Sequence, residues 1–268
     1  MTVDLLPQGY ALGGTAAYAP KTAARLGLRA GVVTTADETL DLPGLLPDVE
    51  IVRIPSRASS TFRNQYQDTH RIQQLLAMAE TVSFESVPLE WRNSPIVHLA
   101  PVVHEIGSIP PELFGGSLVA LTPQGLLRHW DPSGLVKAGA WCGDDSLLDR
   151  SGVVIFSEED VAGDPSFLSR CLGRVPITLL TQGERGATLY SQGEVFQFPA
   201  FRVDAVDPTG AGDVFAAAFL VEYYLTRDPH LSTAFACCAA SLVVESQGLE
   251  GVPDRMAVEE RLKQYPRT

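Results

Sequence analysis

The chain lacks the excess of basic residues that nucleic-acid-binding proteins carry. It has 20 Lys and Arg against 32 Asp and Glu in 268 residues, which gives a formal net charge of −12. Because phosphate backbones are bound through positive surfaces, this balance argues against a nucleic-acid partner. A small phosphate ligand stays compatible with it, since a local site can be positive on an acidic protein.

Cysteines, leader sequences and long apolar runs are also scarce. The four cysteines, none at a metal-ligand spacing, are Cys142, Cys171, Cys237 and Cys238. We interpret them as reduced core residues of a cytoplasmic protein. Residues 1–14 have no signal-peptide pattern, and Glu222 interrupts an apolar run, 214–225, that is too short to span a bilayer. We therefore expect no membrane partner.

Two common nucleotide-binding signatures are missing. No Gly-Lys-Ser/Thr follows the Gly13-Gly14 pair at the spacing of a P-loop. No Gly-x-Gly-x-x-Gly follows an early strand with an acidic residue about 20 positions later, which disfavours a dinucleotide-dependent oxidoreductase. The five histidines are scattered and form no Ser/His/Asp pattern.

Apolar runs and helix-like runs alternate along the chain, and 45% of the residues are hydrophobic. Segments that read as strands are 28–35, 50–54, 95–99, 118–121, 152–156 and 176–181. A hairpin is predicted at 187–198, around Ser191-Gln192-Gly193-Glu194. Segments that read as helices are 18–26, 214–225, 232–245 and 257–264. This alternation predicts a doubly wound α/β sheet, most of it parallel.

The segment Ser59–Tyr66 does not fit this alternation of buried strands and helices. It alternates polar and aromatic residues, as an exposed strand does. It is compatible with part of a small β lid over a site. An ordinary edge hairpin explains the pattern equally well.

The most informative segment is Asp207-Pro208-Thr209-Gly210-Ala211-Gly212-Asp213, followed by an apolar helix-like run. A small-residue turn that opens a helix brings backbone N–H groups close to an anion, and the helix dipole adds to this. Asp213 at the helix start is a candidate base beside that anion. The alternative is a glycine turn with Asp213 as a simple helix cap. The first interpretation predicts phosphoryl transfer.

Three further segments carry weaker signals. Thr181-Gln182-Gly183-Glu184-Arg185-Gly186 follows a predicted strand and allows a nucleotide close approach, or is a plain turn between strands. Gly13-Gly14 precedes a helix and allows a ligand to contact backbone, or is a flexible turn. Ser157-Glu158-Glu159-Asp160 follows another strand and offers Mg²⁺ ligands, or caps a helix.

Together these motifs resemble the PfkB (ribokinase-like) carbohydrate and nucleoside kinases. The Asp207–Asp213 segment is similar to the family's second signature, with Pro208 where Thr is usual. Gly13-Gly14 is similar to its first signature, and Thr181–Gly186 to its nucleotide loop. The resemblance implies one ribokinase-like domain over residues 1–268, a three-layer α/β/α sandwich with a small β lid within 5–12 and 49–72. It points weakly to the branch of inositol and sugar kinases.

The resemblance also implies roles for individual residues. Asp213 would be the base, and the backbone of Gly210, Ala211 and Gly212 the anion hole. The residues of the nucleotide site would be Thr181, Gly183, Gly186 and Gly248. The residues facing the acceptor would be Asp4, Gly13, Gly14 and Asp213. Metal contacts would come from Asp160 for Mg²⁺, and from Asp207 and Thr209 for a monovalent cation such as K⁺.

The function expected on this basis is transfer of the ATP γ-phosphoryl group to a hydroxyl of a small sugar, cyclitol or nucleoside. The alternative is a nucleotide or metabolite sensor on the same fold. It is motivated by two departures from the family: Ser157 and Asp160 replace its Asn and Glu, and Asp4 follows only Met1-Thr2-Val3 where a complete strand is usual. The resemblance further implies a homodimer that pairs through the lid.

Overall fold

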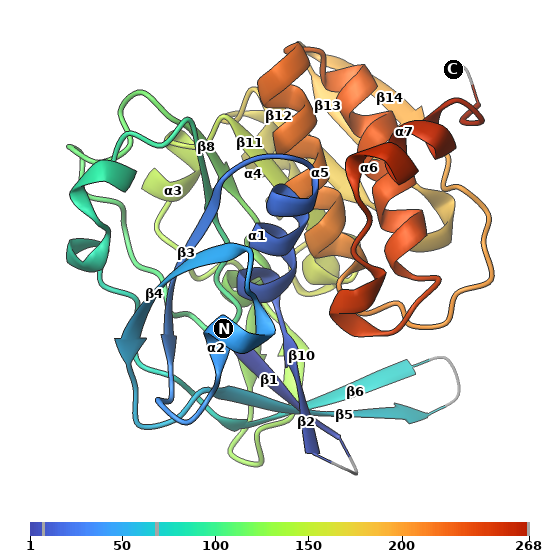
Figure 1. Ribbon diagram of the computed structural model, residues 1–268. Coiled ribbons are helices and arrows are strands. Elements are labelled where there is room, and N and C mark those ends of the chain that lie inside the picture. The colour runs from blue at the N-terminus through green and yellow to red at the C-terminus, as the bar shows by residue number, and fades with distance from the viewer. Residues whose placement is uncertain (7–8, 68–69, 267–268) are drawn as a thin grey trace.

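The centre of the molecule is a six-stranded sheet with the order β14-β13-β12-β11-β8-β7. We analysed a computed structural model, which describes residues 1–6, 9–67 and 70–266 (Figure 1). The strands of this sheet are β7 (Ile96–Leu99), β8 (Leu118–Leu121), β11 (Val153–Ser157), β12 (Ile177–Thr181), β13 (Ala187–Ser191) and β14 (Glu194–Phe198). The first four are parallel, and β13 and β14 form the predicted antiparallel hairpin.

Helices cover both faces of this sheet, as the alternation of side chains along β11 demonstrates. Val153 and Ile155 pack in one core with α5 (Ala211–Thr226) and α6 (Pro229–Val243). Val154 and Phe156 pack in a second core with α3 (Ser146–Asp149) and α4 (Phe167–Leu172). Since successive side chains of a strand point to opposite faces, the sheet lies between two helical layers. The expected α/β/α fold with a largely parallel sheet is confirmed.

Helix α1 (Thr15–Arg25) lies against α5 and joins the first helical layer. It begins three residues before the predicted start at Tyr18, because Gly13-Gly14 leads directly into it. Beyond Leu26 the chain turns at Gly27, whose φ of 96° suits glycine. The last helix, α7 (Arg255–Leu262), packs on α6.

A separate four-stranded sheet, ordered β2-β1-β5-β6, projects below the helices in Figure 1. Its strands are β1 (Thr2–Leu6), β2 (Gly9–Gly13), β5 (Ser60–Gln67) and β6 (His70–Ala77). Strand β1 runs antiparallel to β2 and parallel to β5. The hairpin β5–β6 is thus one half of a small sheet. Phe62 is buried in a cluster with Leu75 from β6 and with Val102 and Val103.

A third unit is the parallel pair of β3 (Ala30–Ala36) and β4 (Val49–Pro55). Strand β4 lies in the range 49–72 that the resemblance assigns to the lid, but it pairs with β3 and not with the four-stranded sheet. The remaining elements are α2 (Leu42–Leu45), β9 (Arg128–Trp130), β10 (Val136–Ala138) and the 3₁₀ turns η1 (Phe84–Ser86), η2 (Leu89–Trp91), η3 (Gln124–Leu127), η4 (Asp160–Gly163), η5 (Gly183–Arg185) and η6 (Gly248–Gly251).

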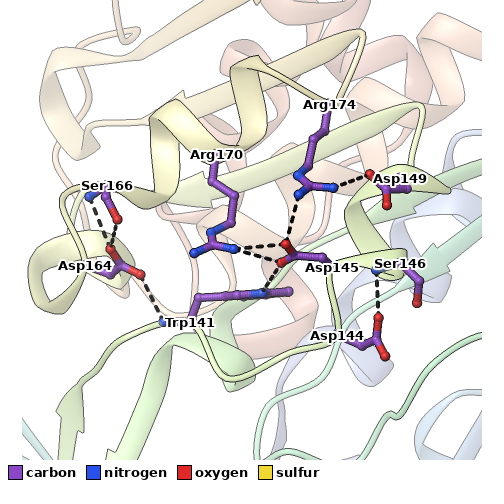
Figure 2. Close-up of polar contacts among 9 residues, drawn as sticks. All are labelled: Trp141, Asp144, Asp145, Ser146, Asp149, Asp164, Ser166, Arg170 and Arg174. Carbon is purple, nitrogen blue, oxygen red and sulfur yellow. Dashed lines mark hydrogen bonds and ion pairs between the residues drawn. The ribbon is translucent and has the colours of Figure 1, made fainter.

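A polar cluster fastens α4 to α3 on the outer face of the second layer (Figure 2). Asp145 accepts hydrogen bonds from Arg170 and Arg174, and Arg174 also reaches Asp149 at 2.7 Å. The indole N–H of Trp141 donates to the same Asp145. Because these side chains are between 35% and 54% exposed, each ion pair adds little stability.

The cysteines agree with the sequence interpretation except at one position. Cys171, Cys237 and Cys238 are buried, and burial raises the pKa of each thiol to about 12. Cys142 is exposed, so its assignment to the core is wrong. It lies in a loop, where no apolar periodicity marked it. No helix in the described part of the chain is long and apolar enough to cross a membrane.

Candidate active site

The Asp207–Asp213 segment forms a loop that ends in the first turn of α5. Gly210 precedes the helix with a φ of 83°, and Asp213 lies in the first turn. The first N–H groups of a helix have no intrahelical acceptor and carry its positive dipole end. Apart from its chain neighbours and the backbone of its own helix, no heavy atom lies within 4 Å of the position that a Cβ of Gly212 would take. The N–H of Ala211 donates to Pro208 O at 3.3 Å, so the turn offers the N–H groups of Gly210 and Gly212 beside this open space, as an anion site requires.

The Asp207 carboxylate holds this loop in shape. One of its oxygens accepts the N–H of Thr209 at 2.9 Å, and the other accepts the N–H of Gly248 at 3.1 Å. The structure thus brings Gly248, predicted from the resemblance alone, against the start of the loop. This bond links η6 to α5 across 41 positions of sequence.

Tyr18 is a residue at this site that the sequence analysis did not select. A Cβ on Gly210 would collide with the Tyr18 ring, and only 1% of Tyr18 is exposed. Burial first, then the negative charges of Asp207, Asp213 and Asp4, raise the pKa of its hydroxyl. The Tyr18 ring therefore packs under Gly210, and its hydroxyl is kept protonated by burial and by the charges of the three carboxylates. In the sequence it is an aromatic residue in an apolar helix, a pattern typical of core, so only its place four residues after Gly14 pointed to the site.

Strand β1 and the Gly-Gly turn form the opposite wall. Asp4 accepts a hydrogen bond from the Asn64 side chain at 3.0 Å, and Asn64 accepts one from Gln73 at 2.9 Å. A Cβ on Gly13 would collide with the Asp4 carboxylate, so glycine is needed for this approach. Sequence analysis found Asp4 and Gly13 but missed the connection to Asn64, which depends on the pairing of β1 with β5.

One hydrogen bond joins the two walls. Thr15, the first residue of α1, donates its hydroxyl to Asp213 Oδ1 at 2.5 Å. Gly14, just before it, adopts a φ of 73° and packs against Thr2. The predicted acceptor residues and the predicted base therefore come together, although 198 positions separate Thr15 from Asp213.

The Thr181–Gly186 segment connects β12 to β13 through η5. Gly183 and Gly186 have φ values of 56° and 99°, and a Cβ on Gly186 would collide with the backbone of Phe198. Gln182 donates its side-chain amide to Glu158 at 2.6 Å. The loop lies at the carboxyl ends of β11 and β12, where α/β sheets bind ligands. Its turn geometry accounts for both glycines, and the nucleotide role stays a prediction.

The predicted Mg²⁺ ligand Asp160 is engaged within its own turn. Oδ2 accepts hydrogen bonds from the N–H and hydroxyl of Ser157, and Oδ1 accepts one from Gln124 at 3.3 Å. In the part of the chain that the structure describes, no three His, Cys, Asp or Glu side chains cluster as a metal cage. Both carboxylate oxygens of Asp160 accept protein hydrogen bonds, so a Mg²⁺ ion here would be held mainly by donor phosphates and water. The roles of Asp160, Asp207 and Thr209 toward cations stay predictions.

Comparison with known sequences assigns a class to this arrangement. Residues 171–255 match the model of the pfkB family carbohydrate kinases, a range that contains both the Thr181–Gly186 loop and the Asp207–Asp213 segment. A nucleoside kinase from Methanocaldococcus jannaschii is 25% identical over 180 residues, which are 65% of this chain and 57% of that kinase. The chain thus spans little more than half the length of this relative.

Comparison with solved structures shows the same fold over almost the whole chain. A pyrophosphate-dependent kinase of the ribokinase family superposes with a TM-score of 0.78 and 20% identity, over 97% of this chain and 96% of the other. An Arabidopsis thaliana ribokinase, solved with ribose and ATP, superposes with a TM-score of 0.69 and 24% identity, over 98% of this chain and 95% of the other. The resemblance inferred from the motifs is confirmed: residues 171–255 match the pfkB family carbohydrate kinases, and the chain has the ribokinase fold.

Proposed function

We propose that the protein transfers a phosphoryl group from ATP to a hydroxyl of a small sugar, cyclitol or nucleoside, with Asp213 as the base. The observation that carries this proposal is the meeting of two walls at Asp213. On one side are the first N–H groups of α5, and on the other are Thr15, Asp4 and the Gly-Gly turn. A donor phosphate over α5 and an acceptor beside Asp4 would thus share one carboxylate.

The backbone of Gly210, Ala211 and Gly212 would stabilise the transferring group. In phosphoryl transfer, negative charge spreads over the oxygens in the transition state, so catalysis depends on positioning and electrostatics. N–H groups fixed at a helix start supply such stabilisation without rearranging during the reaction. The open space beside Gly212 leaves room for those oxygens.

Asp213 would accept the proton of the attacking hydroxyl. An alcohol is a far weaker acid than a carboxylic acid, so the proton moves as the new P–O bond forms and not before. The hydrogen bond from Thr15 orients the carboxylate toward the acceptor wall. The Tyr18 ring packs directly against Gly210 and so sets the spacing between the turn and α1.

The donor in this proposal is ATP with Mg²⁺, and the nucleotide would lie along Thr181, Gly183, Gly186 and Gly248. When bound, Mg²⁺ would neutralise charge on the donor phosphates. Asp160 is the residue proposed to reach it through water, while Asp207 and Thr209 are proposed to contact a monovalent cation. The structural neighbour that uses pyrophosphate makes inorganic pyrophosphate the donor to test beside ATP.

The acceptor would lie beside Asp4, Gly13 and Asn64. The amide of Asn64 and the carboxylate of Asp4 are suited to polyol hydroxyls, because together they supply donors and acceptors. The matched relatives act on nucleosides and ribose, which supports this substrate class. The four-stranded sheet would close over the acceptor and exclude water.

This sheet would also pair with a second copy of the chain. Large apolar side chains exposed on it are Leu5, Leu6, Tyr10 and Leu76. Exposed apolar clusters favour protein–protein contact. We expect a dimer by light scattering and a monomer for Leu6→Asp, with Met256→Asp on α7 as the matched control that leaves the mass unchanged. A monomeric wild-type protein contradicts this part of the proposal.

A panel assay tests the function. ATP or pyrophosphate is incubated with Mg²⁺ and with ribose, fructose, myo-inositol or a nucleoside, and donor consumption and phosphorylated product are measured. With at least one acceptor, we expect the amount of phosphorylated product to equal the amount of donor consumed. The alternative sensor function predicts binding of nucleotide or polyol by calorimetry without product, and that outcome would replace the proposed transfer.

A further inference from the structure

Hairpin β9–β10, which spans Arg128–Ala138, forms a two-stranded sheet of its own beside the four-stranded sheet (Figure 1). It follows β8 and η3 in the chain. Strand β10 contacts β6 of the four-stranded sheet and also η4, the turn that begins at Asp160. The hairpin therefore lies between an element of the proposed acceptor side and an element of the proposed donor side.

The tip of the hairpin is bonded to β6. The N–H of Leu75 donates to Gly134 O at 2.8 Å, and the side-chain amide of Gln74 donates to Ser133 O at 2.7 Å. Gly134 has a φ of 82°, and a Cβ at this position would collide with the carbonyl oxygen of Leu75. Because a backbone atom cannot rotate out of the way, this approach requires glycine.

The turn at the tip is also fixed internally. One carboxylate oxygen of Asp131 accepts the N–H of Ser133 at 2.9 Å and the N–H of Leu135 at 3.2 Å. The N–H of Gly134 donates to the carbonyl oxygen of Asp131 at 2.8 Å. Since Asp side chains that bond to the following backbone stabilise turns, the tip meets β6 as a preformed unit.

The strands of the hairpin pack on the acceptor side. Trp130 and Val136, which are paired across the hairpin, pack against the cluster that contains the buried Phe62 and Leu75. Phe62 lies two positions before Asn64 on β5, so both side chains are on the same face of the four-stranded sheet. The hairpin therefore supports the face that carries the proposed acceptor wall.

The base of the hairpin rests on η4. A Cβ on Gly163, the last residue of η4, would lie 2.5 Å from the backbone nitrogen of Gly139 and 2.6 Å from the carbonyl carbon of Ala138. These are again backbone atoms, so glycine is needed here as well. On the same side, Gln124 of η3 donates to Asp160 at 3.3 Å. A displacement of η4 would therefore displace β10.

We propose that hairpin β9–β10 positions the acceptor by fixing strand β6 relative to the η4 turn, with Gly134 and Gly163 as positioning residues. This inference rests on the proposed function, which places the acceptor beside Asn64 and Mg²⁺ near Asp160. Reaction between two bound molecules depends on their relative placement to within about 1 Å. A rigid spacer between the two sides supplies that placement, and a change at either end of it alters the binding of the acceptor.

The first test changes the β6 end of the hairpin. Gly134→Ala is compared with Gly193→Ala in the β13–β14 turn, where φ is 80° and a Cβ would meet no atom within 4 Å. The two changes share the backbone strain and differ in the contact with Leu75. We expect Gly134→Ala to speed hydrogen exchange at residues 72–77 by about tenfold and Gly193→Ala to leave it unchanged. Equal exchange in both variants would overturn the proposal.

The second test changes the η4 end, far along the chain from β6. Gly163→Ala is compared with Gly173→Ala, whose Cβ would make an ordinary contact with Ser169 O at 3.9 Å. We expect Gly163→Ala, and not its control, to speed exchange at residues 72–77. It should also raise the KM for the acceptor by about threefold or more, although it lies on the donor side. Unchanged exchange at β6 in Gly163→Ala would overturn the proposal.

A milder variant keeps the test decisive if a glycine variant does not fold. Gln74→Ala removes only the hydrogen bond to Ser133. We expect it to raise the KM for the acceptor by about two- to threefold and to leave the KM for the donor unchanged. An unchanged KM for the acceptor, or an equal rise in both constants, would overturn the positioning role.

Hydrogen exchange needs no turnover, so its outcome is separate from that of the panel assay. Normal exchange in Gly163→Ala together with phosphorylated product would overturn the role of the hairpin and leave the proposed function standing. Faster exchange without product from any acceptor would overturn the proposed function, and with it the positioning of an acceptor. Faster exchange with a raised KM for the acceptor is the result that we expect.

Discussion

The carboxyl-terminal and amino-terminal halves of this molecule are organised differently. From β7 to α7 the chain contributes all six strands of the main sheet and helices on both of its faces, and the family model matches within this part. Before β7 the chain forms a four-stranded sheet and a separate strand pair, which no described strand joins to the main sheet. The proposed donor side therefore belongs to a continuous framework, and the proposed acceptor side to attached units.

At the site, α1 links the two halves through the Thr15–Asp213 hydrogen bond and the packing of Tyr18 on Gly210. Substitutions in the carboxyl-terminal half should alter the rate of the chemical step. Substitutions in α1 should alter the coupling between the two walls, and substitutions in the four-stranded sheet should alter only the binding of the acceptor.

The largest effect is expected from Asp213→Asn on the chemical step. An amide cannot accept the hydroxyl proton, so kcat should fall by about 10²–10⁴-fold. The Tm should stay close to that of the wild type, because Asn keeps the shape of the side chain. Steady-state assays with the best acceptor of the panel measure kcat. A kcat within threefold of the wild type would contradict the role of Asp213.

Next in size is the contrast between Gly210→Ala and Gly212→Ala. A methyl group at Gly210 meets the buried Tyr18 ring at a positive φ, so unfolding free energy should fall by about 2–4 kcal/mol. The same change at Gly212 enters open space and should alter stability by less than about 0.5 kcal/mol. It should still lower kcat, because the methyl group occupies the proposed phosphate position. Urea unfolding measures the change in stability of each variant, and steady-state assays measure its kcat. Equal destabilisation would refute the described packing.

Thr15→Val tests the contact between the halves. It removes the hydrogen bond to Asp213 and keeps the shape, so kcat should fall about tenfold, as expected for one hydrogen bond to a charged group. Thr15→Ser retains the hydroxyl and should restore most of the activity. An unaltered kcat in Thr15→Val would indicate that the carboxylate needs no support from α1.

A smaller effect is expected from Asn64→Ala in the four-stranded sheet. Loss of the hydrogen bond to Asp4 should raise the KM for the acceptor by about three- to tenfold. The KM for the donor should remain the same, since this residue lies on the acceptor wall. A parallel rise in both constants would mean that the two walls do not act separately.

The smallest effect concerns His98 on β7. Burial lowers its pKa from 6.5 to about 4, and its Nε2 lies 2.7 Å from Thr122 Oγ1. Between these pH values the unfolded chain binds a proton that the folded chain does not. Stability should therefore decline as the pH falls from 6.5 toward 4. Urea midpoints at pH 7 and pH 5 should differ less in His98→Gln, and an equal difference would exclude His98 as the cause.

Much of the carboxyl-terminal half could be predicted from sequence, because its signals are local. Strands 118–121, 153–157 and 177–181 are short apolar runs, and the 191–194 turn sets the hairpin register. The helix predicted over 214–225 is present, but it begins three residues earlier, at Ala211, inside the small-residue turn. Local composition decides each of these elements, so no long-range contact had to be known.

The strand pairing of the amino-terminal half could not be predicted from sequence, because it depends on contacts between residues far apart in the chain. Strand β4 reads like its neighbours in sequence, yet it pairs with β3 and not with the four-stranded sheet. Asn64 becomes a site residue only through the pairing of β1 with β5. Tyr18 has the pattern of a core residue and is one, but its position under Gly210 follows from the packing of α1 on α5.

The central claim is that acceptor and donor meet at Asp213, and a crystal structure with ADP, aluminium fluoride and the acceptor tests it most directly. We expect the aluminium fluoride, which stands in for the transferring phosphoryl group, to lie over the N–H groups of Gly210–Gly212. The acceptor oxygen should lie within hydrogen-bond distance of Asp213, about 2.6–3.2 Å. A fluoride group bound elsewhere, or an acceptor oxygen out of reach of Asp213, would contradict the account.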